Sequence, residues 1–290
     1  MGCSRRLDKR GPCPPHSRKG KRSRVVSRAV QTAIILVGDE LLAGHTRDAN
    51  AHFLAQRLAA LGHRLKRIVV VPDDAHALAE EADRLLAMAD LVFVSGGLGP
   101  THDDRTTEAL AARFGRRLVL HEPSWSRLLA RYATRGLSDA TREAAKKMVM
   151  VPEGAEVLDN PVGAAPGYVL REGASALVVF PGVPAELVGI FEQGVVGRLL
   201  PAGARIGLVE AEVEMAEAAF AAPLARVAER FGDVEIGSYP HHGERRVTLR
   251  FKGDEARGEA ALRAFLEACP EARKHLLGAP KTSDGTTIPV

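Results

Sequence analysis

Glycines, hydroxyl residues and carboxylates are concentrated in the stretch 95–108, SGGLGPTHDDRTTE, which directly follows an apolar run. Its three glycines allow a tight turn and a close backbone approach to a ligand. Thr101, Asp103 and Asp104 then offer capping oxygens to a helix that we expect to run to about residue 114. Amides at a helix start favour phosphate, and adjacent carboxylates suit a divalent cation. The stretch therefore predicts a site for a phosphorylated ligand and a metal.

Two further acidic loops follow apolar runs in the same way. Gly38-Asp39-Glu40 follows the run at 32–37, and Pro72-Asp73-Asp74 follows the run at 65–71. Taken alone, each is more simply a turn that caps a helix. Ligands of parallel sheets, however, bind at the carboxyl ends of the strands, which share one edge. We therefore expect all three acidic loops to meet there.

The elements that must position these loops alternate between strand and helix. Such alternation predicts a doubly wound, mostly parallel α/β sheet with right-handed crossovers, followed by a small C-terminal α+β subdomain. The predicted strands are 32–37, 65–71, 90–95, 168–170 and 176–180, and the helices between and after them include 48–61, 74–88 and 185–200. A β-α-β-β-α unit over 206–268 forms the subdomain. The predicted divisions are a basic disordered tail (1–29), the α/β domain (30–202), the small domain (203–278) and a disordered tail (279–290).

Composition narrows the possible functions. Residues 1–28 hold ten Lys and Arg against Asp8 alone, so that stretch carries +9 of a total charge of +4, and the rest of the chain carries −5. The high isoelectric point is thus no sign of nucleic-acid binding. No apolar run reaches the roughly 20 residues of a membrane span, and the three scattered cysteines indicate a reducing compartment. We expect a cytoplasmic protein with neither nucleic acid nor membrane as partner.

Five motifs occur in order along the chain: GDELLAGHTRDAN, VVVPDD, SGGLGPTHDDRTTEA, NPVGAAPGY and FPGVPAEL. This set closely resembles the molybdopterin-binding-like domain of the competence/damage-inducible protein A (CinA) family, which is related to the proteins MogA and MoaB and to the N-terminal domain of eukaryotic FAD synthase. The match covers about residues 31–200. The segment around Glu235–Pro240 resembles the small domain that follows in this family. The resemblance implies a three-layer domain of that type.

The resemblance also implies an activity. Full-length CinA proteins carry a further domain for nicotinamide-nucleotide deamidation, which this sequence ends too soon to contain. The stand-alone form suggests a metal-dependent nucleotide pyrophosphatase acting on ADP-ribose, FAD or a related dinucleotide. Two alternatives stay open: a non-catalytic molybdopterin-binding or competence-related accessory protein, and a molybdopterin adenylyltransferase. Relatives assemble as dimers or trimers, so a homo-oligomer is expected.

Specific residues follow from matching the motifs. Asp73 and Asp104 correspond to the aspartates that the cofactor-adenylylating relatives use, so they are the predicted catalytic residues. The predicted ligands of a divalent metal (Mg, Mn or Co) are Asp39, Glu40, Asp73, Asp103 and Asp104. The residues expected to contact a nucleotide, or molybdopterin, are Gly38, Asn50, Gly96, Gly97, Leu98, Gly99, Pro100, Thr101 and His102.

Overall fold

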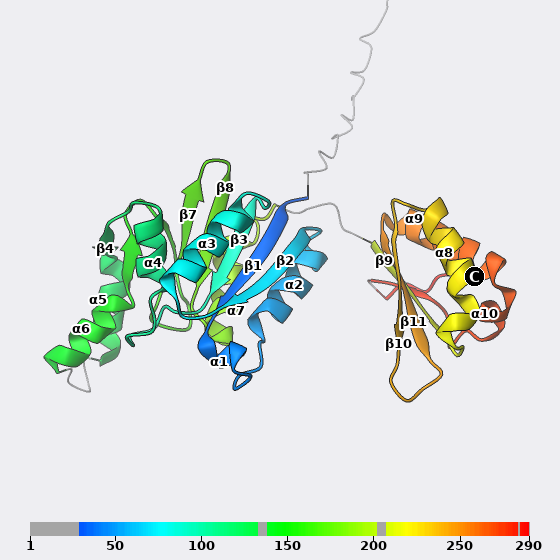
Figure 1. Ribbon diagram of the computed structural model, residues 1–290, viewed down its shortest axis with the longest axis horizontal. Helices are drawn as coiled ribbons and strands as arrows, with labels where there is room; N and C mark the ends of the chain where they lie inside the picture. Colours follow the sequence, from blue (N-terminus) through cyan, green and yellow to red (C-terminus); the bar gives the residue numbers. More distant parts are fainter. Residues whose placement is uncertain (1–28, 133–137, 202–206, 284, 290) are drawn as a thin grey trace, which may run out of the picture.

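The structure, a computed structural model, describes residues 29–132, 138–201, 207–283 and 285–289. These residues form a larger α/β domain and a smaller α+β domain (Figure 1). The predicted basic tail at 1–28 lies outside the described residues. Within the described ranges, no helix combines the length and apolar character that crossing a bilayer requires.

The larger domain is built on a six-stranded sheet with the order β2-β1-β3-β8-β7-β6. Four neighbouring strands are parallel, and β7 runs antiparallel to both β8 and β6. The mostly parallel sheet predicted from the alternating pattern is confirmed. The strands are β1 (Gln31–Val37), β2 (Arg64–Val71), β3 (Leu91–Ser95), β6 (Glu156–Leu158), β7 (Gly167–Glu172) and β8 (Ser175–Phe180); β4 (Leu118–Leu120) and β5 (Met150–Pro152) form a separate pair.

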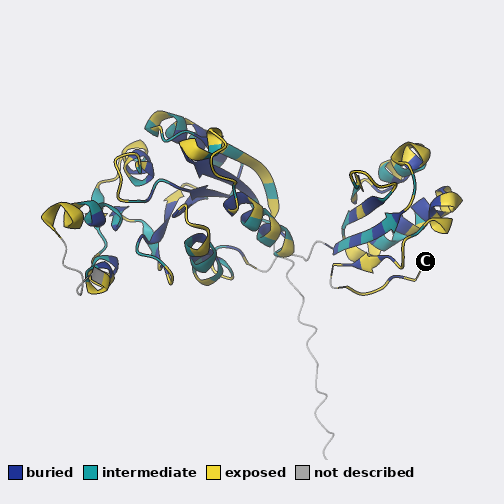
Figure 2. Ribbon diagram, turned by 90° about the horizontal axis from the view of Figure 1, so that it is seen from below, coloured by how far each residue is buried: buried dark blue, intermediate teal, exposed yellow. Residues whose placement is uncertain are grey.

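Helices cover both faces of this sheet because its central strands are apolar on both sides. Ile35 and Val94 pack with α3 and α4 on one face, whereas Ile34 and Phe93 pack with α2 and α7 on the other. Figure 2 shows the resulting buried layer between half-exposed helices. The helices are α1 (Asp39–Leu42), α2 (Asn50–Ala60), α3 (Ala75–Leu86), α4 (Thr106–Arg113), α5 (Glu122–Tyr132), α6 (Asp139–Lys147) and α7 (Pro184–Ile190).

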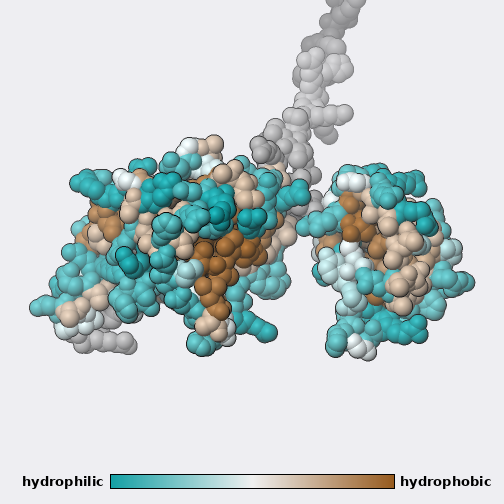
Figure 3. Space-filling model, in the orientation of Figure 1, coloured by the Kyte–Doolittle hydropathy of each residue, from teal (hydrophilic) through white to brown (hydrophobic). Residues whose placement is uncertain are grey.

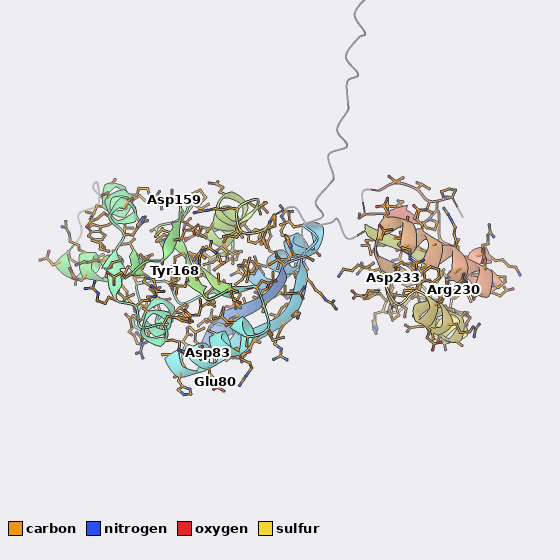
Figure 4. The ribbon with its side chains drawn as sticks, turned by 90° about the horizontal axis from the view of Figure 1, so that it is seen from above. Glu80, Asp83, Asp159, Tyr168, Arg230 and Asp233 are labelled. Carbon is orange, nitrogen blue, oxygen red and sulfur yellow. The ribbon has the colours of Figure 1, made fainter. Side chains whose placement is uncertain are left out.

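Contacts with helix α3 and strand β7 fix the position of α4, which follows the glycine loop. Asp83 and Glu80 lie on α3 (Figure 4), and Arg113 of α4 donates to Asp83 over 2.7 Å. Tyr168 of β7 is buried and donates to Thr107 of α4. Burial raises the pKa of the Tyr168 phenol, so the hydroxyl stays protonated as that donor.

The predicted helix at 185–200 is shorter than expected. The α-helix ends at Ile190, and a π-helical turn covers Phe191–Val195. The Val196 amide donates to the Phe191 carbonyl over 3.1 Å, five residues earlier. This wider turn leaves both Phe191 and Val195 fully buried in the core. Core packing therefore outweighs local helix propensity here.

The smaller domain is a four-stranded antiparallel sheet, β10-β11-β9-β12, with its helices on one face. Val209, Leu249 and Phe251 of the sheet pack with Phe220 of α8 and Phe265 of α9. The predicted β-α-β-β-α order is confirmed. The elements are β9 (Gly207–Val213), α8 (Glu217–Arg230), β10 (Glu235–Pro240), β11 (Val247–Gly253), α9 (Glu255–Ala268), α10 (Pro270–Lys274) and β12 (Lys281–Thr282).

The segment after residue 278 differs from the disordered tail that we expected. Lys281–Thr282 form β12 and pair antiparallel with β9. Ile288 is 2 % exposed and joins the core of the smaller domain. The buried side chain of Ile288 and the pairing of β12 with β9 therefore attach this segment to the smaller domain.

One buried histidine predicts a pH-dependent stability. His63 is 2 % exposed, and its Nδ1 accepts the Val30 amide over 3.3 Å. Burial lowers the pKa of His63 below its ordinary value of 6.5 and outweighs the raising effect of the Pro201 carbonyl. As the pH falls, His63 is therefore protonated at a higher pH in the unfolded chain than in the folded one. We expect the free energy of unfolding to fall as the pH drops below about 6.5.

Chemical denaturation at a series of pH values measures this effect. The variant His63→Gln keeps a hydrogen-bond acceptor and should show a shallower loss between pH 7 and pH 5 than the wild type. His52→Gln, at an exposed position on α2, is the matched control and should keep the wild-type slope. Equal slopes in all three proteins would contradict the assignment.

Candidate functional site

A cleft of about 410 Å³ lies at the carboxyl ends of β1, β3 and β8. Its walls come from the glycine loop after β3, the acidic loops after β1 and β2, and the loop after β8. Of the residues predicted for the site, the structure brings together around this cleft Glu40, Asn50, Asp73, Gly96, Gly97, Leu98, Gly99, Pro100, Asp103 and Asp104. The expected convergence of the three acidic loops on one sheet edge is therefore what the structure shows.

The glycine loop needs its glycines because other atoms press against it. A methyl group on Gly96 would overlap the carbonyl oxygen of Val37, and one on Gly97 would overlap the Thr106 hydroxyl. Both glycines have positive φ, 116° and 66°. Among the described residues, none accepts a hydrogen bond from the amides of Gly97, Leu98 and Gly99. Three neighbouring backbone donors are thus left for an anionic ligand.

The start of α4 differs from the prediction. The helix begins at Thr106, and its cap position, Arg105, has no side-chain hydrogen bond. The Asp104 carboxylate turns back into the loop instead and accepts the Thr101 amide over 3.0 Å. The first amide of α4 is occupied, since Thr106 donates to the Gly97 carbonyl over 3.1 Å. The loop amides, and not the helix start, are therefore the available donors.

The carboxylates of the cleft influence one another. Burial of Asp73 raises its pKa, and the nearby carboxylates of Asp39, Glu40 and Asp103 raise it further. The Asp39 amide donates to Asp73 over 2.9 Å, which acts in the opposite direction. The Thr101 hydroxyl, together with smaller effects that include the His102 and Lys147 charges, lowers the pKa of Asp103. The acidic loops are thus close enough for their charges to repel.

Four predicted residues do not line the cleft. Gly38 donates its amide to the Val71 carbonyl over 3.1 Å and so joins the ends of β1 and β2. Asp39 donates its backbone amide to the Asp73 carboxylate, and Thr101 donates its amide to the Asp104 carboxylate. The His102 side chain is 99 % exposed, with its ring 3.9 Å from Asp103. None of these four residues lines the cleft.

A divalent cation is compatible with the donor set of the cleft. In the part of the chain that the structure describes, no three His, Cys, Asp or Glu side chains are arranged to hold a metal ion. Glu40, Asp73, Asp103 and Asp104 nevertheless supply carboxylate oxygens to one cleft, the ligand type that Mg²⁺ and Mn²⁺ prefer. Their mutual repulsion at Asp73 is the kind of strain that a cation relieves.

Asn50 lines the cleft, and its side chain also connects three parts of the fold. Its side-chain NH₂ donates to the Ser95 hydroxyl over 2.9 Å and to the Gly182 carbonyl over 2.7 Å. Both donor hydrogens are therefore used, and the residue is only 8 % exposed. Its Oδ1 has no partner among the described residues. Asn50 joins α2, β3 and the loop after β8, and it can offer a ligand an acceptor but no donor.

Sequence reasoning missed several side chains at the site, among them Lys147 and Glu186. Lys147 of α6 donates to the Thr101 carbonyl over 2.6 Å and so holds the far end of the glycine loop. Glu186 of α7 lines the cleft and accepts the buried Asn160 amide over 2.6 Å. Glu186 lies in the FPGVPAEL motif, which contributes to the family resemblance but does not by itself mark this carboxylate as a site residue. Lys147 had no local signal, because it is brought to the loop by helix packing.

Comparison with known proteins identifies this arrangement. Residues 33–201 match the model described as a probable molybdopterin binding domain. The chain belongs to this molybdopterin-binding domain family. The part that matches contains the whole cleft, and residues 208–275 match the middle domain of FAD synthase. The molybdopterin-binding-type domain is thus followed by a second unit of known type.

Individual relatives agree with this assignment. A protein of Aeropyrum pernix is 40% identical over 215 residues, which are 73% of this chain and 79% of that protein. A CinA-like protein of Chlorobaculum tepidum is 41% identical over 176 residues, covering 59% of this chain but only 41% of the relative. The crystal structure of the protein CinA from Thermoplasma acidophilum superimposes with a TM-score of 0.51 at 34% identity, over 57% of this chain and 96% of that one. The resemblance to the CinA family is confirmed.

Proposed function

We propose that this protein is a metal-dependent pyrophosphatase that hydrolyses ADP-ribose, FAD or a related dinucleotide. The observation that carries the proposal is the position of three unoccupied amides, those of Gly97, Leu98 and Gly99, beside the carboxylate of Asp104. Backbone donors of this kind bind phosphate oxygens and take up the charge that develops on them. Carboxylates so close to a phosphate need a cation between them.

The chain's own residues have separate tasks in this reaction. Asp73, Asp103 and Asp104 would hold the divalent cation, with Glu40 close by. Such a cation supplies charge neutralisation of the pyrophosphate and a more acidic bound water. The Thr101 amide donates to the Asp104 carboxylate and so orients it. Lys147 donates to the Thr101 carbonyl and so holds Thr101 in place. The amides of the glycine loop orient the phosphate. Water adds to one phosphorus atom, one P–O bond of the bridge breaks, and two phosphomonoesters leave.

A panel of substrates and metals tests this proposal. The purified protein is incubated with ADP-ribose, FAD and related dinucleotides in Mg²⁺, Mn²⁺ or Co²⁺, and the products are separated by chromatography. We expect AMP as a common product, formed only when a divalent cation is present and lost on chelation. A panel left intact with every metal would contradict the proposal.

A binding protein without catalysis is the second candidate, and the match to a probable molybdopterin binding domain favours it. In that case the cleft would hold a pterin through the same loop amides. Pterin binding that survives the loss of both Asp73 and Asp104, with no turnover of any dinucleotide, would select this alternative. Adenylylation of molybdopterin by ATP, the third candidate, requires pterin affinity together with ATP turnover.

The predicted homo-oligomer stays a prediction, as does the cytoplasmic location. One feature is compatible with association. The edge strand β2 exposes Ile68 (46 %) and Val70 (37 %), and Figure 3 shows an apolar area on the face of the larger domain that carries β1 and β2. Exposed apolar areas of this kind occur at protein interfaces.

A further inference from the structure

A second cavity, of about 360 Å³, lies on the other side of the glycine loop from the cleft. It is formed where α4, α6 and the β4–β5 pair meet. Its outer walls are Thr107, Glu108, Leu118, Glu143, Lys146, Lys147 and Met150. Its volume is at the lower end of the range for small-molecule sites, about 300–1,000 Å³. It is therefore large enough for one part of a ligand.

The two cavities have one wall in common. Gly97, Leu98, Gly99 and Asp104 border both the cleft and the second cavity. These are the residues that supply the unoccupied amides and the carboxylate predicted to be catalytic. A ligand whose central phosphates bind to this wall would therefore extend in two directions, one into each cavity. Together the two volumes fall well inside the range for a larger ligand.

The lining of the second cavity combines apolar surface with two lysines and the carboxylates of Asp104, Glu108 and Glu143. Leu98, Leu118 and Met150 supply apolar atoms on which a flat ring can pack. Lys147 is already engaged with the Thr101 carbonyl and lies 3.9 Å from Glu108. Lys146 is partly buried, and no carboxylate of the described residues lies within ion-pair distance of it. An anionic group on the ligand would supply that missing partner.

We propose that the second cavity binds one nucleoside monophosphate half of a dinucleotide, while the cleft binds the other half. The ring system of that half packs on Leu118 and Met150, and its phosphate, which is one of the two in the bridge, pairs with Lys146. The pyrophosphate bridge then lies at the shared wall, next to Asp104. The inference rests on the proposed function in taking a dinucleotide as the ligand. It adds that the site selects dinucleotides over mononucleotides because each half has its own cavity.

Calorimetric titration of the full chain tests the second cavity without relying on turnover. The two probes are AMP and an ADP-ribose analogue whose bridging oxygen is replaced by methylene, both in Mg²⁺. We expect the wild type to bind the analogue at least about 10-fold more tightly than AMP. Leu118→Trp fills the cavity, so that only the cleft can take either probe, and it should abolish this preference. Lys146→Met should reduce the preference without adding bulk.

Val119→Trp is the matched control, because Val119 neighbours Leu118 on β4, does not line the cavity and is 36 % exposed. It should bind both probes like the wild type. An unchanged preference in Leu118→Trp would overturn the inference, as would equal affinities of the wild type for the two probes or no binding of the analogue. If Leu118→Trp does not fold, an unchanged preference in Lys146→Met decides against it. Selective analogue binding without hydrolysis of natural dinucleotides would contradict only the proposed function.

Discussion

Replacing Asp104 by asparagine is expected to lower kcat for dinucleotide hydrolysis by about 10³-fold. The substitution keeps an oxygen that can accept the Thr101 amide, so the loop should keep its shape. It removes the negative charge at the wall that the two cavities have in common. Because Asp104 is partly exposed, the free energy of unfolding should change by less than about 1 kcal/mol.

Asp103→Asn is the matched comparison for this experiment. Asp103 also borders the cleft, but its side chain is 60 % exposed and it does not border the second cavity. We therefore expect a smaller loss, about 10-fold, from the neighbouring substitution. Steady-state rates in the best metal, with denaturation curves for each variant, give the comparison. If Asp104→Asn retains wild-type kcat, Asp104 is not catalytic.

The glycine loop should be equally intolerant of change, through stability as much as through activity. In Gly96→Ala the new methyl group would meet the carbonyl oxygen of Val37, which belongs to the central strand β1 and cannot move aside. Gly96 also has a φ of 116°, which L side chains rarely adopt. The clash and the strained backbone together should cost about 2–5 kcal/mol. We further expect loss of phosphate binding, because the following amides would shift.

Gly115→Ala separates the two causes. Gly115 has a φ of 61°, but a methyl group there would have no neighbour within 4 Å. That variant should lose only about 1 kcal/mol, the cost of a left-handed backbone conformation alone. Urea denaturation measures both free energies of unfolding. Equal losses for Gly96→Ala and Gly115→Ala would show that the close approach to Val37 is unimportant.

Much of the architecture could be predicted from local patterns. Continuous apolar runs such as 32–37 and 90–95 predict strands buried on both faces, and their alternation with helices predicts a parallel sheet. Asp74 was expected to cap a helix, and its carboxylate accepts the Ala77 amide over 2.8 Å. Periodicity and capping act over a few residues, so a single sequence contains them in full.

The failures lie where contacts distant in sequence compete with local rules. Asp104 was expected to cap α4, yet it bonds to Thr101, because the close packing of Gly97 against Thr106 fixes how the chain enters the helix. The helix predicted at 185–200 changes into a π turn at Phe191, which the aromatic core holds. Ile288 binds a supposed tail to the smaller domain for the same reason.

The candidate site shows the same division between features that local sequence predicts and features that long-range packing decides. Sequence alone indicates which loops carry phosphate-binding glycines and carboxylates, because the order of strands places those loops at one edge. It does not indicate that His102 faces solvent or that Asn50 has used both its donor hydrogens. Nor does it show that Lys146 and Lys147 lie beside the glycine loop. Lys147 contacts Thr101, which is 46 residues earlier in the sequence. Side-chain direction and long-range packing depend on the folded chain as a whole, and these decide what each loop can bind.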